Sequence, residues 1–358
     1  VAGNAAAQVT SASFTVDTTL PTISAIATSA FSWGSHLNAT EDNSNGTVSV
    51  TTGGVANDQV VTITLNGQAY TGSVTSNSAT VTITASDLQA LTDGNTYSLT
   101  ADVSDVAGNA AAQVTSASFT VDTVLPTLVS AITGDNNSDG TVDRLVLTFS
   151  EQVDLTSVDN NNFTLTESAG GSPTITGSYS SSDQTTVTLT LTGVTANNTS
   201  LTISPNYDDG TGTIKDNAGN EMSFSEDVAG TDGVAPTISA IATSAFSWGS
   251  HLNATEDNSN GTVSVTTGGV ANDQVVTITL NGQAYTGSVT SNSATVTITA
   301  SDLQALTDGN TYSLTADVSD VAGNAAAQVT SASFTVDTTL PTISAIATSA
   351  FSWGSHLN

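Results

Sequence analysis

Short runs in which apolar and polar residues alternate recur along most of the chain. Val61, Ile63 and Leu65 are separated by threonines, and Val81 and Ile83 follow the same pattern. Successive side chains of a strand point to opposite faces, so this alternation predicts antiparallel strands with one buried face. In the first third of the chain it predicts strands at 22–29, 47–52, 59–65, 68–75, 79–85, 96–103 and 111–121, with a helical turn at 87–91.

The turn residues between these runs agree with the strand prediction. Asn66-Gly67 separates two apolar runs and predicts a tight hairpin with positive φ at both positions. Seven short strands in about 100 residues is typical of an immunoglobulin-like sandwich. Leu145–Phe149 and Val187–Leu191 alternate in the same way further along. The predicted fold is all-β: a tandem array of seven-stranded immunoglobulin-like antiparallel β-sandwiches joined by short Pro-containing linkers.

Internal identity divides the chain into repeats, because Pro21–Thr123 is identical to Pro236–Thr338. Proline, with an aspartate four residues before it, marks each boundary and predicts a short, stiff link. The predicted domains are repeat A at 21–125 and again at 236–340, segment B at 126–235, and remnants of neighbouring repeats at 1–20 and 341–358. Each remnant carries about one strand, so we expect it to be disordered, docked on a neighbour, or ordered only by further chain.

The charge balance narrows the function. Asp and Glu number 32 against 2 Lys and Arg, which gives a formal net charge of −30. Such a chain cannot form the basic patch that nucleic acid requires, and an anionic membrane surface repels it. Cysteine is absent, which excludes disulfides and thiolate metal sites. We find no apolar run long enough to insert into a membrane, and expect any signal peptide to lie outside this sequence.

The strand order of such a sandwich places the last aspartate of one domain near the first loops of the next. The predicted groups are Asp17 with Asp102, Asp105 and Asn109; Asp122 with Asp216 and Asn220; and Asp227 or Asp232 with Asp317, Asp320 and Asn324. Carboxylates without a nearby base repel one another unless a cation binds, and Ca2+ accepts six to eight oxygen ligands. The alternative is that these residues only cap turns.

A second candidate calcium loop lies in segment B. Oxygen-bearing side chains occupy positions 1, 3, 5, 7 and 9 of a short run: Asp135, Asn137, Asp139, Thr141 and Asp143. Gly140 at position 6 permits the tight turn that an EF-hand loop uses there. Position 12 is Val146 rather than Glu, and strands flank the run, so it is not an EF-hand.

With these motifs the chain resembles the extender region of giant bacterial surface adhesins, the biofilm-associated and often RTX-type proteins built from tandem bacterial immunoglobulin-like domains. The motifs in repeat A are Leu37–Glu41, Val61–Gly67, Asp87–Leu91, Asp93–Tyr97, Asp105–Asn109 and Phe119–Asp122. Those in segment B are Asp139–Gly140, Asp143–Glu151 and Asp216–Asn220. The resemblance implies a calcium-stiffened spacer on the bacterial cell surface. Its partners are neighbouring domains of the same chain, and domains outside this sequence bind the adhesive target. The RTX nonapeptide is absent, which leaves the secretion route open.

Three other functions are alternatives to a spacer. Catalysis is disfavoured because His36, His251 and His356 each follow a serine directly, and adjacent residues rarely give a nucleophile and base the required geometry. Threonine-rich faces or the tryptophans Trp33 and Trp248 could bind glycans or ice, although such threonines are ordinary on a solvated sheet and such tryptophans more often anchor a loop. A subunit of an S-layer or extracellular filament is the third alternative.

Overall fold

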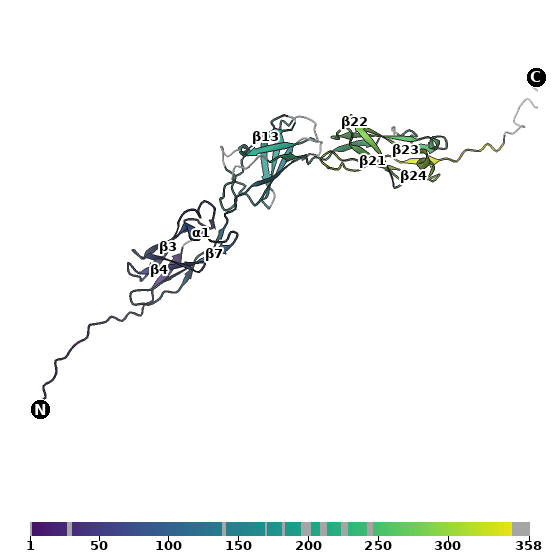
Figure 1. Cartoon of the computed structure of the whole chain (residues 1–358). Coiled ribbons are helices and arrows are strands. Elements are labelled where there is room, and N and C mark those ends of the chain that lie inside the picture. The colour runs from purple at the N-terminus through teal and green to yellow at the C-terminus, as the bar shows by residue number, and fades with distance from the viewer. Residues whose placement is uncertain are drawn as a thin grey trace, which may run out of the picture. The chain divides into compact units, whose positions relative to one another are not determined.

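The computed structural model describes residues 2–26, 31–137, 141–168, 170–180, 183–194, 202–207, 213–222, 228–241 and 246–345. Contacts divide the chain into two compact units (Figure 1). The first contains Val1–Thr127, Glu151–Val158 and Thr213–Ser223, and the second contains Leu128–Ser150, Asp159–Gly212 and Phe224–Asn358. Strands dominate both units and the helices are short, which confirms the all-β prediction. Among the described residues, no helix has the length and apolarity to cross a membrane.

The strands of the first repeat A form three sheets. Their order is β1-β3-β6, β5-β4-β8-β9 and β2-β10-β7, and every pair is antiparallel except β2 with β10. The elements are β1 (Thr22–Ile26), β2 (His36–Leu37), β3 (Gly46–Gly53), β4 (Val60–Leu65), β5 (Gln68–Ser73), β6 (Ser78–Ile83), α1 (Ala85–Leu88), β7 (Thr96–Tyr97), β8 (Leu99–Val103), β9 (Val114–Thr115) and β10 (Phe119–Val121).

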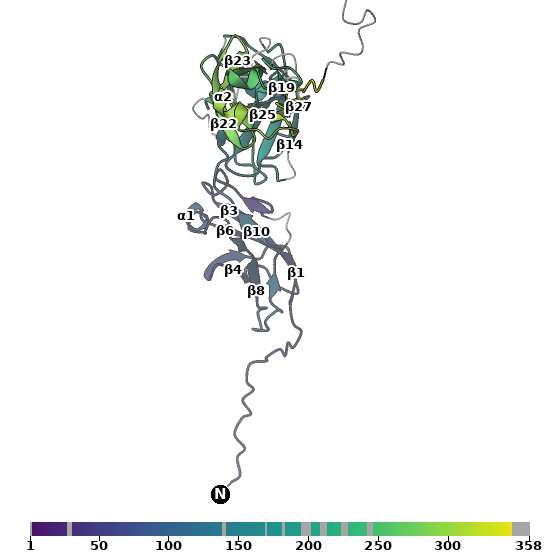
Figure 2. The same ribbon diagram turned by 90° about the vertical axis from the view of Figure 1, so that its right-hand side faces the viewer.

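One hydrophobic core lies between these sheets. Along β3, β4, β6 and β8 every second side chain is buried, as the alternating sequence predicts, and the strands are labelled in Figure 2. Val48 and Val81 enter the core from one sheet, Ile63 from the second and Phe119 from the third. Because all three sheets contribute to the same cluster, the repeat is a sandwich whose outer faces carry the threonines.

The long connection from β1 to β2 is anchored in this core by aromatic rings. Phe31 stacks on Trp33 with ring centroids 5.4 Å apart, and Trp33 meets Phe119 edge-on at 5.3 Å. Gly46 permits this packing, since a Cβ there would lie 2.0 Å from Cζ3 of Trp33. Trp33 is 4% exposed and Trp248 5%. The loop-anchoring interpretation is therefore confirmed, and a sugar site on exposed tryptophans at these positions is excluded.

Predicted and observed elements differ at a few edges. Asn66 and Gly67 have φ of 48° and 82°, which confirms the predicted hairpin turn. The run predicted as one strand at 111–121 is two strands, because β9 pairs with β8 whereas β10 crosses to pair with β2 and β7. The helical turn begins earlier than predicted because Thr84 caps it, accepting from the backbone of Asp87.

The second repeat A, in the second unit, folds like the first. Its elements are β18 (Thr237–Ile241), β19 (His251–Asn253), η5 (Glu256–Asn258), β20 (Gly261–Gly268), β21 (Val275–Leu280), β22 (Gln283–Thr290), β23 (Ser293–Ile298), α2 (Ala300–Gln304), β24 (Thr311–Tyr312), β25 (Leu314–Asp317), β26 (Val329–Thr330) and β27 (Phe334–Asp337). Here β22 pairs with both β21 and β23, so the two larger sheets are recorded as one seven-stranded sheet, β18-β20-β23-β22-β21-β25-β26. The sheet β19-β27-β24 completes the repeat.

Segment B contributes a five-stranded sheet, β14-β15-β12-β11-β17, and a two-stranded sheet, β13-β16. Its elements are β11 (Leu128–Gly134), β12 (Arg144–Phe149), η2 (Asn160–Asn162), β13 (Phe163–Glu167), β14 (Thr174–Ser180), β15 (Thr186–Thr192), β16 (Ile203–Tyr207) and β17 (Gly230–Thr231). Two of its loops, Glu151–Val158 and Thr213–Ser223, group with the first unit. The domain boundaries drawn from the repeats therefore stay predictions.

The end segments are exposed where they are described. Residues 2–20 have no regular secondary structure, are exposed throughout, and run away from the strands of the first unit in both views (Figures 1 and 2). Residues 341–345 are also exposed, and 346–358 lie outside the described residues.

Candidate metal centre

An Asp-x-Ala-Gly-Asn loop occurs in each repeat A and once in segment B, with the same conformation each time. The carboxylate of its aspartate accepts from the backbone N–H of the asparagine at 2.8 Å in all three loops. It also accepts from the asparagine side-chain amide at 2.9, 2.7 and 2.9 Å. The intervening glycine has a φ between 91° and 95°, which explains why glycine is required there. The loops are Asp105–Asn109, Asp216–Asn220 and Asp320–Asn324.

In every case the oriented asparagine reaches the backbone of an aspartate at the end of a preceding strand or segment. Asn109 Nδ2 donates to the carbonyl of Asp17 at 3.1 Å. The corresponding distances are 2.8 Å from Asn220 to Asp122 and 3.2 Å from Asn324 to Asp232. We call this contact the loop-to-strand clamp. The structure thus brings together most of the residues predicted in each group, through hydrogen bonds that the chain makes by itself.

The aspartates of these loops are buried hydrogen-bond acceptors. Asp105 is 8% exposed, Asp216 3% and Asp320 4%. The hydrogen bond from the Asn109 side chain lowers the pKa of Asp105, with further backbone donors in the loop acting in the same direction. Their first role is therefore to orient the asparagine, which the turn-capping alternative anticipated in part.

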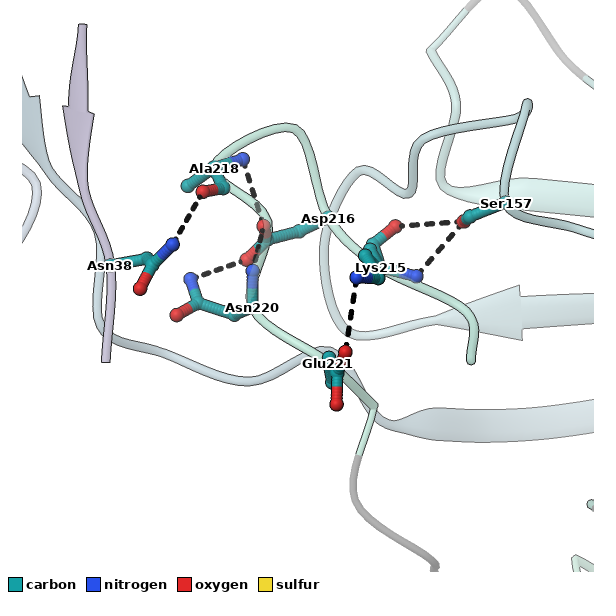
Figure 3. Close-up of polar contacts among 7 residues, drawn as sticks. All are labelled: Asn38, Ser157, Lys215, Asp216, Ala218, Asn220 and Glu221. Carbon is teal, nitrogen blue, oxygen red and sulfur yellow. Dashed lines mark hydrogen bonds and ion pairs between the residues drawn. The ribbon is translucent and has the colours of Figure 1, made fainter. Parts of the chain in front are cut away.

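The clamp in the middle of the chain carries an additional carboxylate. Oxygen atoms of Asp122, Glu151 and Asp216 all lie within 4.8 Å of one another. Asp216 is already bonded to the backbone N–H groups of Ala218 and Asn220 and to the Asn220 amide (Figure 3). The Oε1 atom of Glu151, by contrast, is buried without a hydrogen-bond partner. We call these three residues the acidic cluster.

The electrostatics of the acidic cluster reflect burial of like charges. Burial raises the pKa of Glu151 to about 7, and the charges of Asp122 and Asp216 act in the same direction. Burial, followed by Asp216, also raises the pKa of Asp122. The nearby cation does not relieve this repulsion, because the ammonium of Lys215 is 3.0 Å from Glu221 and pairs with it (Figure 3). Among the described residues no lysine or arginine pairs with the cluster, and the charge of His36 acts against the rise in the pKa of Asp122 without cancelling it.

The residues present fit a hard divalent cation. Ca2+ holds oxygen ligands at 2.3–2.6 Å, so two ligands of one ion lie up to about 5 Å apart, and the acidic cluster meets that limit. Glu151 supplies an oxygen that no protein group satisfies, and Asp216 is fixed in position by its own loop. The chemistry of the donor set, carboxylate oxygens alone, excludes soft metals and favours Ca2+ or Mg2+.

The other two clamps lack the third carboxylate. Strand register shows why, because Leu128 and Ile238 are equivalent positions two residues after the boundary proline. Leu128 pairs with Phe149, and Ile238 pairs with Thr267. Two residues beyond these partners stands Glu151 in segment B but Gly269 in repeat A. Burial and the charge of Asp320 raise the pKa of Asp232, whose Oδ2 is buried without a partner. That clamp therefore offers two carboxylates where the middle one offers three.

Sequence reasoning did not identify Glu151, nor the segment Asn38–Glu41 that contacts the middle loop. Asn38 Nδ2 donates to the carbonyl of Ala218 at 3.1 Å (Figure 3). The backbone N–H of Ala39 donates to Asn220 Oδ1 at 2.7 Å. The sequence signal that could have identified Glu151 is its position two residues after the predicted strand that ends at Phe149. For Asn38 no local signal existed, because β2 is only two residues long.

Two predicted ligands lie elsewhere. Asp102 accepts from Gln113 Nε2 through both oxygens, at 3.1 and 2.9 Å, and Asp317 is held in the same way by Gln328. Each lines an open surface pocket, of about 330 Å³ beside Asp58 and about 340 Å³ beside Asp273. The structure does not bring Asp102 or Asp317 into a clamp, since the neighbours of Asp102 on β8 point inward and turn its own side chain to the outer face.

The candidate loop in segment B is described only at its ends. Asp143 Oδ1 accepts from the backbone of Asn136 at 2.7 Å, and Asp135 Oδ1 accepts from the backbone of Asn137 at 3.1 Å. Thr141 has contacts of its own. Asp139 and Asp227 lie outside the described residues. A calcium site in this loop stays a prediction.

The described serine–histidine pairs each share a hydrogen bond. Ser35 Oγ lies 3.2 Å from Nδ1 of His36, and Ser250 Oγ lies 3.1 Å from Nδ1 of His251. A hydrogen bond between two exposed neighbours does not by itself define a nucleophile. His356 lies outside the described residues.

Part of the chain matches a known protein family. Residues 122–229 match the bacterial Ig-like domain family. No curated protein matches the chain.

Similar solved structures include a 1.5-MDa bacterial ice-binding adhesin studied for host cell surface retention, 23% identical over 87% of this chain and 96% of that chain, with a TM-score of 0.31. A Ca2+-stabilized adhesin that helps an Antarctic bacterium reach out and bind ice is 23% identical over 88% of this chain and 74% of that chain, with a TM-score of 0.27. A tetra-tandem repeat in the extending region of a large adhesion protein is 20% identical over 88% and 73%, with a TM-score of 0.25.

Proposed function

We propose that this chain is a structural spacer of an extracellular bacterial adhesin, and that Ca2+ bound at the acidic cluster stiffens it. The bacterial Ig-like match at 122–229 and the identical repeats on either side support a tandem array. Repetition of one sequence extends a chain without adding a new recognition surface. The adhesive target is bound by domains beyond this sequence, and the partners of these domains are their neighbours in the chain.

The observation that carries the proposal is the unsatisfied carboxylate of Glu151. A buried carboxylate oxygen without a donor is unfavourable, and here oxygen atoms of two more carboxylates lie within 4.8 Å of a Glu151 oxygen. A divalent cation at this point would neutralise the repulsion and supply the missing partner.

The chain's own residues explain why a cation there would add stiffness. Asp122 follows the last strand of the first repeat A, whereas Asp216 and Glu151 belong to two loops of segment B. The Asn220 amide and the Ala218 backbone hold Asp216 in place, and Asn220 also holds the carbonyl of Asp122. A cation shared by the three carboxylates would cross-link the strand end to both loops. Because only the folded chain presents the cluster, binding also stabilises the fold by mass action.

The proposed location at the cell surface follows from the calcium affinity that we propose for the site. We take the site to have the affinity of extracellular calcium modules, whose dissociation constants are about 10⁻⁴–10⁻³ M. Such sites fill at the roughly millimolar calcium outside cells and stay empty at cytosolic calcium. A spacer locked in this way suits the bacterial cell surface.

Small-angle X-ray scattering tests the proposal directly. The intact chain is measured with millimolar calcium, after chelation, and after calcium is restored, alongside Glu151→Gln. Asp58→Asn, which changes an exposed carboxylate outside the cluster, is the matched control. We expect chelation to broaden the distance distribution of the wild type and of Asp58→Asn, and to change Glu151→Gln much less. Identical profiles with and without calcium for the wild type would refute calcium stiffening.

A further inference from the structure

The turn at residues 92–95 holds one more aspartate close to the acidic cluster. The N–H of Gly94 donates to the carbonyl of Val121 at 2.8 Å, which fixes this turn to the end of β10. Asp122 is the next residue of the chain after that strand. Asp93 lies in the fixed turn, is exposed, and is not one of the three residues of the cluster.

Asp93 uses only one of its two carboxylate oxygens to hold the chain. Its Oδ1 atom accepts from the backbone N–H of Thr123 at 2.6 Å and from the hydroxyl of the same residue at 3.0 Å. Within the described part of the chain, no hydrogen bond reaches the Oδ2 atom of Asp93. One oxygen therefore anchors the residue that follows Asp122, and the other has no protein donor.

The equivalent aspartate of the second repeat A has donors on both oxygens. Asp308 Oδ1 accepts from the N–H and the hydroxyl of Thr338 at 2.6 and 3.0 Å, and Asp308 Oδ2 accepts from the hydroxyl of Thr339 at 2.7 Å. The Thr338 backbone, followed by the Thr339 hydroxyl, lowers the pKa of Asp308. The two turns have the same sequence, and the missing donor is explained by Val124, which stands in the first repeat where the second has Thr339.

This difference occurs at the clamp that has the third carboxylate. Val124 precedes segment B, which supplies Glu151. Thr19 has the same place before the first repeat A, where Gly54 stands at the position of Glu151. The oxygen of Asp93 without a donor and the carboxylate of Glu151 are therefore found together.

The charge of Asp93 acts on the acidic cluster. Burial is the main cause of the raised pKa of Asp122 and of Glu151, and the charge of Asp93 acts in the same direction on both. Among the described residues, Asp93 is the one carboxylate outside the cluster whose charge acts on both groups. A negative charge that disfavours ionised carboxylates favours a cation bound between them, because the Coulomb energy changes sign with the charge.

We propose that Asp93 raises the calcium affinity of the acidic cluster without joining its direct ligands, and that Val124 keeps the second oxygen of Asp93 available. This inference rests on the proposed function, because it concerns the same cation. Asp93 does not belong to the group of carboxylates within 4.8 Å of one another, so it acts through its charge and through water. Ca2+ accepts water among its six to eight ligands, and Asp93 Oδ2 can accept a hydrogen bond from such a water.

Calcium-dependent hydrogen exchange tests the inference at the cluster itself. Peptides covering 144–158 and 213–222 of the intact chain are followed as calcium rises to about 10 mM, which exceeds the range of extracellular sites. The midpoint of protection gives the apparent dissociation constant. Asp93→Asn keeps an oxygen that can accept from Thr123 but loses the charge, so we expect its midpoint to be about three- to tenfold higher than that of the wild type.

Val124→Thr returns the hydroxyl that the second repeat A uses to bond the second carboxylate oxygen. Val124 is 52% exposed and threonine has nearly the same shape, so the fold should tolerate the change. We expect the midpoint to rise about two- to threefold, since the hydrogen bond takes up the oxygen that would otherwise face the bound water. Asp308→Asn and Thr339→Val are the matched controls in the second repeat A, and neither should move the midpoint.

Salt separates the effect of charge from damage to the turn. In about 1 M NaCl the Debye length falls to about 3 Å, so the difference between Asp93→Asn and the wild type should shrink below about twofold. A disturbed turn would weaken binding equally at both salt concentrations.

The outcomes distinguish this inference from the proposed function. An unchanged midpoint in Asp93→Asn, or a change that high salt leaves intact, would overturn the role of Asp93 while the wild type still bound calcium. A midpoint of Val124→Thr equal to that of the wild type would overturn the role of Val124. Absence of calcium-dependent protection in the wild type would instead refute the calcium site, and this inference with it.

Discussion

Replacing Glu151 by glutamine removes one charge from the acidic cluster and keeps the shape of the side chain. Without calcium, the folded wild type must hold three carboxylates within 4.8 Å of one another. Burial raises the folded-state pKa of Glu151 from 4.5 to about 7. Between these pH values the folded chain keeps a proton that the unfolded chain has lost, so stability falls as pH rises through this window. Below it the residue is protonated in both states and contributes no difference.

The magnitude follows from the pKa. A change from 4.5 to about 7 corresponds to about 3 kcal/mol in the free energy of unfolding once the pH exceeds 7. Glu151 is only partly buried, and solvent screening reduces this to about 1–3 kcal/mol. In chelator, Glu151→Gln should therefore be more stable than the wild type by that amount at pH 8. The two should converge near pH 4.

Hydrogen exchange measured by mass spectrometry is the suitable assay, because it reports local stability in a chain of several domains. Peptides covering 144–158 and 213–222 are followed at several pH values, corrected for intrinsic exchange. Protection in Glu151→Gln should exceed wild type at high pH, while Asp58→Asn should match wild type. Equal protection at pH 8, or a difference that does not shrink toward pH 4, would refute the reasoning.

Two further predictions concern packing. Asn220→Ala should lower the free energy of unfolding by about 2–4 kcal/mol, and Asn109→Ala by about 1–2 kcal/mol. The loss is larger at Asn220 because that side chain is more buried and also accepts from the N–H of Ala39. Thermal unfolding of the two variants checks this order. Trp33→Ala should lower the free energy of unfolding of its repeat by about 3–5 kcal/mol, the usual loss when a large aromatic side chain is removed from a core. Trp248→Ala should cause an equal loss in the second repeat A. Urea unfolding followed by circular dichroism measures both, and unequal losses would contradict equivalent cores.

Much of the sandwich could be predicted from the chain because its strands follow simple alternation. Val61, Ile63 and Leu65 are buried and the threonines between them are partly or fully outside, as period two requires. The same rule, applied more strictly, would have placed Asp102 correctly. Ala101 and Val103 point into the core, so Asp102 must lie on the outer face of β8 rather than toward Asp17.

Other parts of the site depend on pairings that no local pattern reveals. Glu151 lies beside Asp216 because Val153, two residues later, forms an isolated antiparallel bridge with Asp216, and no local pattern in the sequence reveals that pairing. Asn38 contacts Ala218 because β2, a strand of two residues, pairs in parallel with β10, which lies far from it in the sequence of the repeat. The loops could be predicted from Asp-x-Ala-Gly-Asn. That their asparagine, rather than a metal, makes the first contact with the preceding aspartate depends on geometry that only the structure supplies.

Calcium binding at the acidic cluster is tested most directly by titration calorimetry on the intact, chelator-stripped chain. Wild type, Glu151→Gln and Asp58→Asn are titrated with calcium under identical conditions, so that any site in the 135–143 loop contributes equally to all three. We expect Glu151→Gln to lose one class of binding sites and Asp58→Asn to retain it. Superimposable isotherms for wild type and Glu151→Gln, or no calcium binding by the wild type, would contradict a cation at Asp122, Glu151 and Asp216.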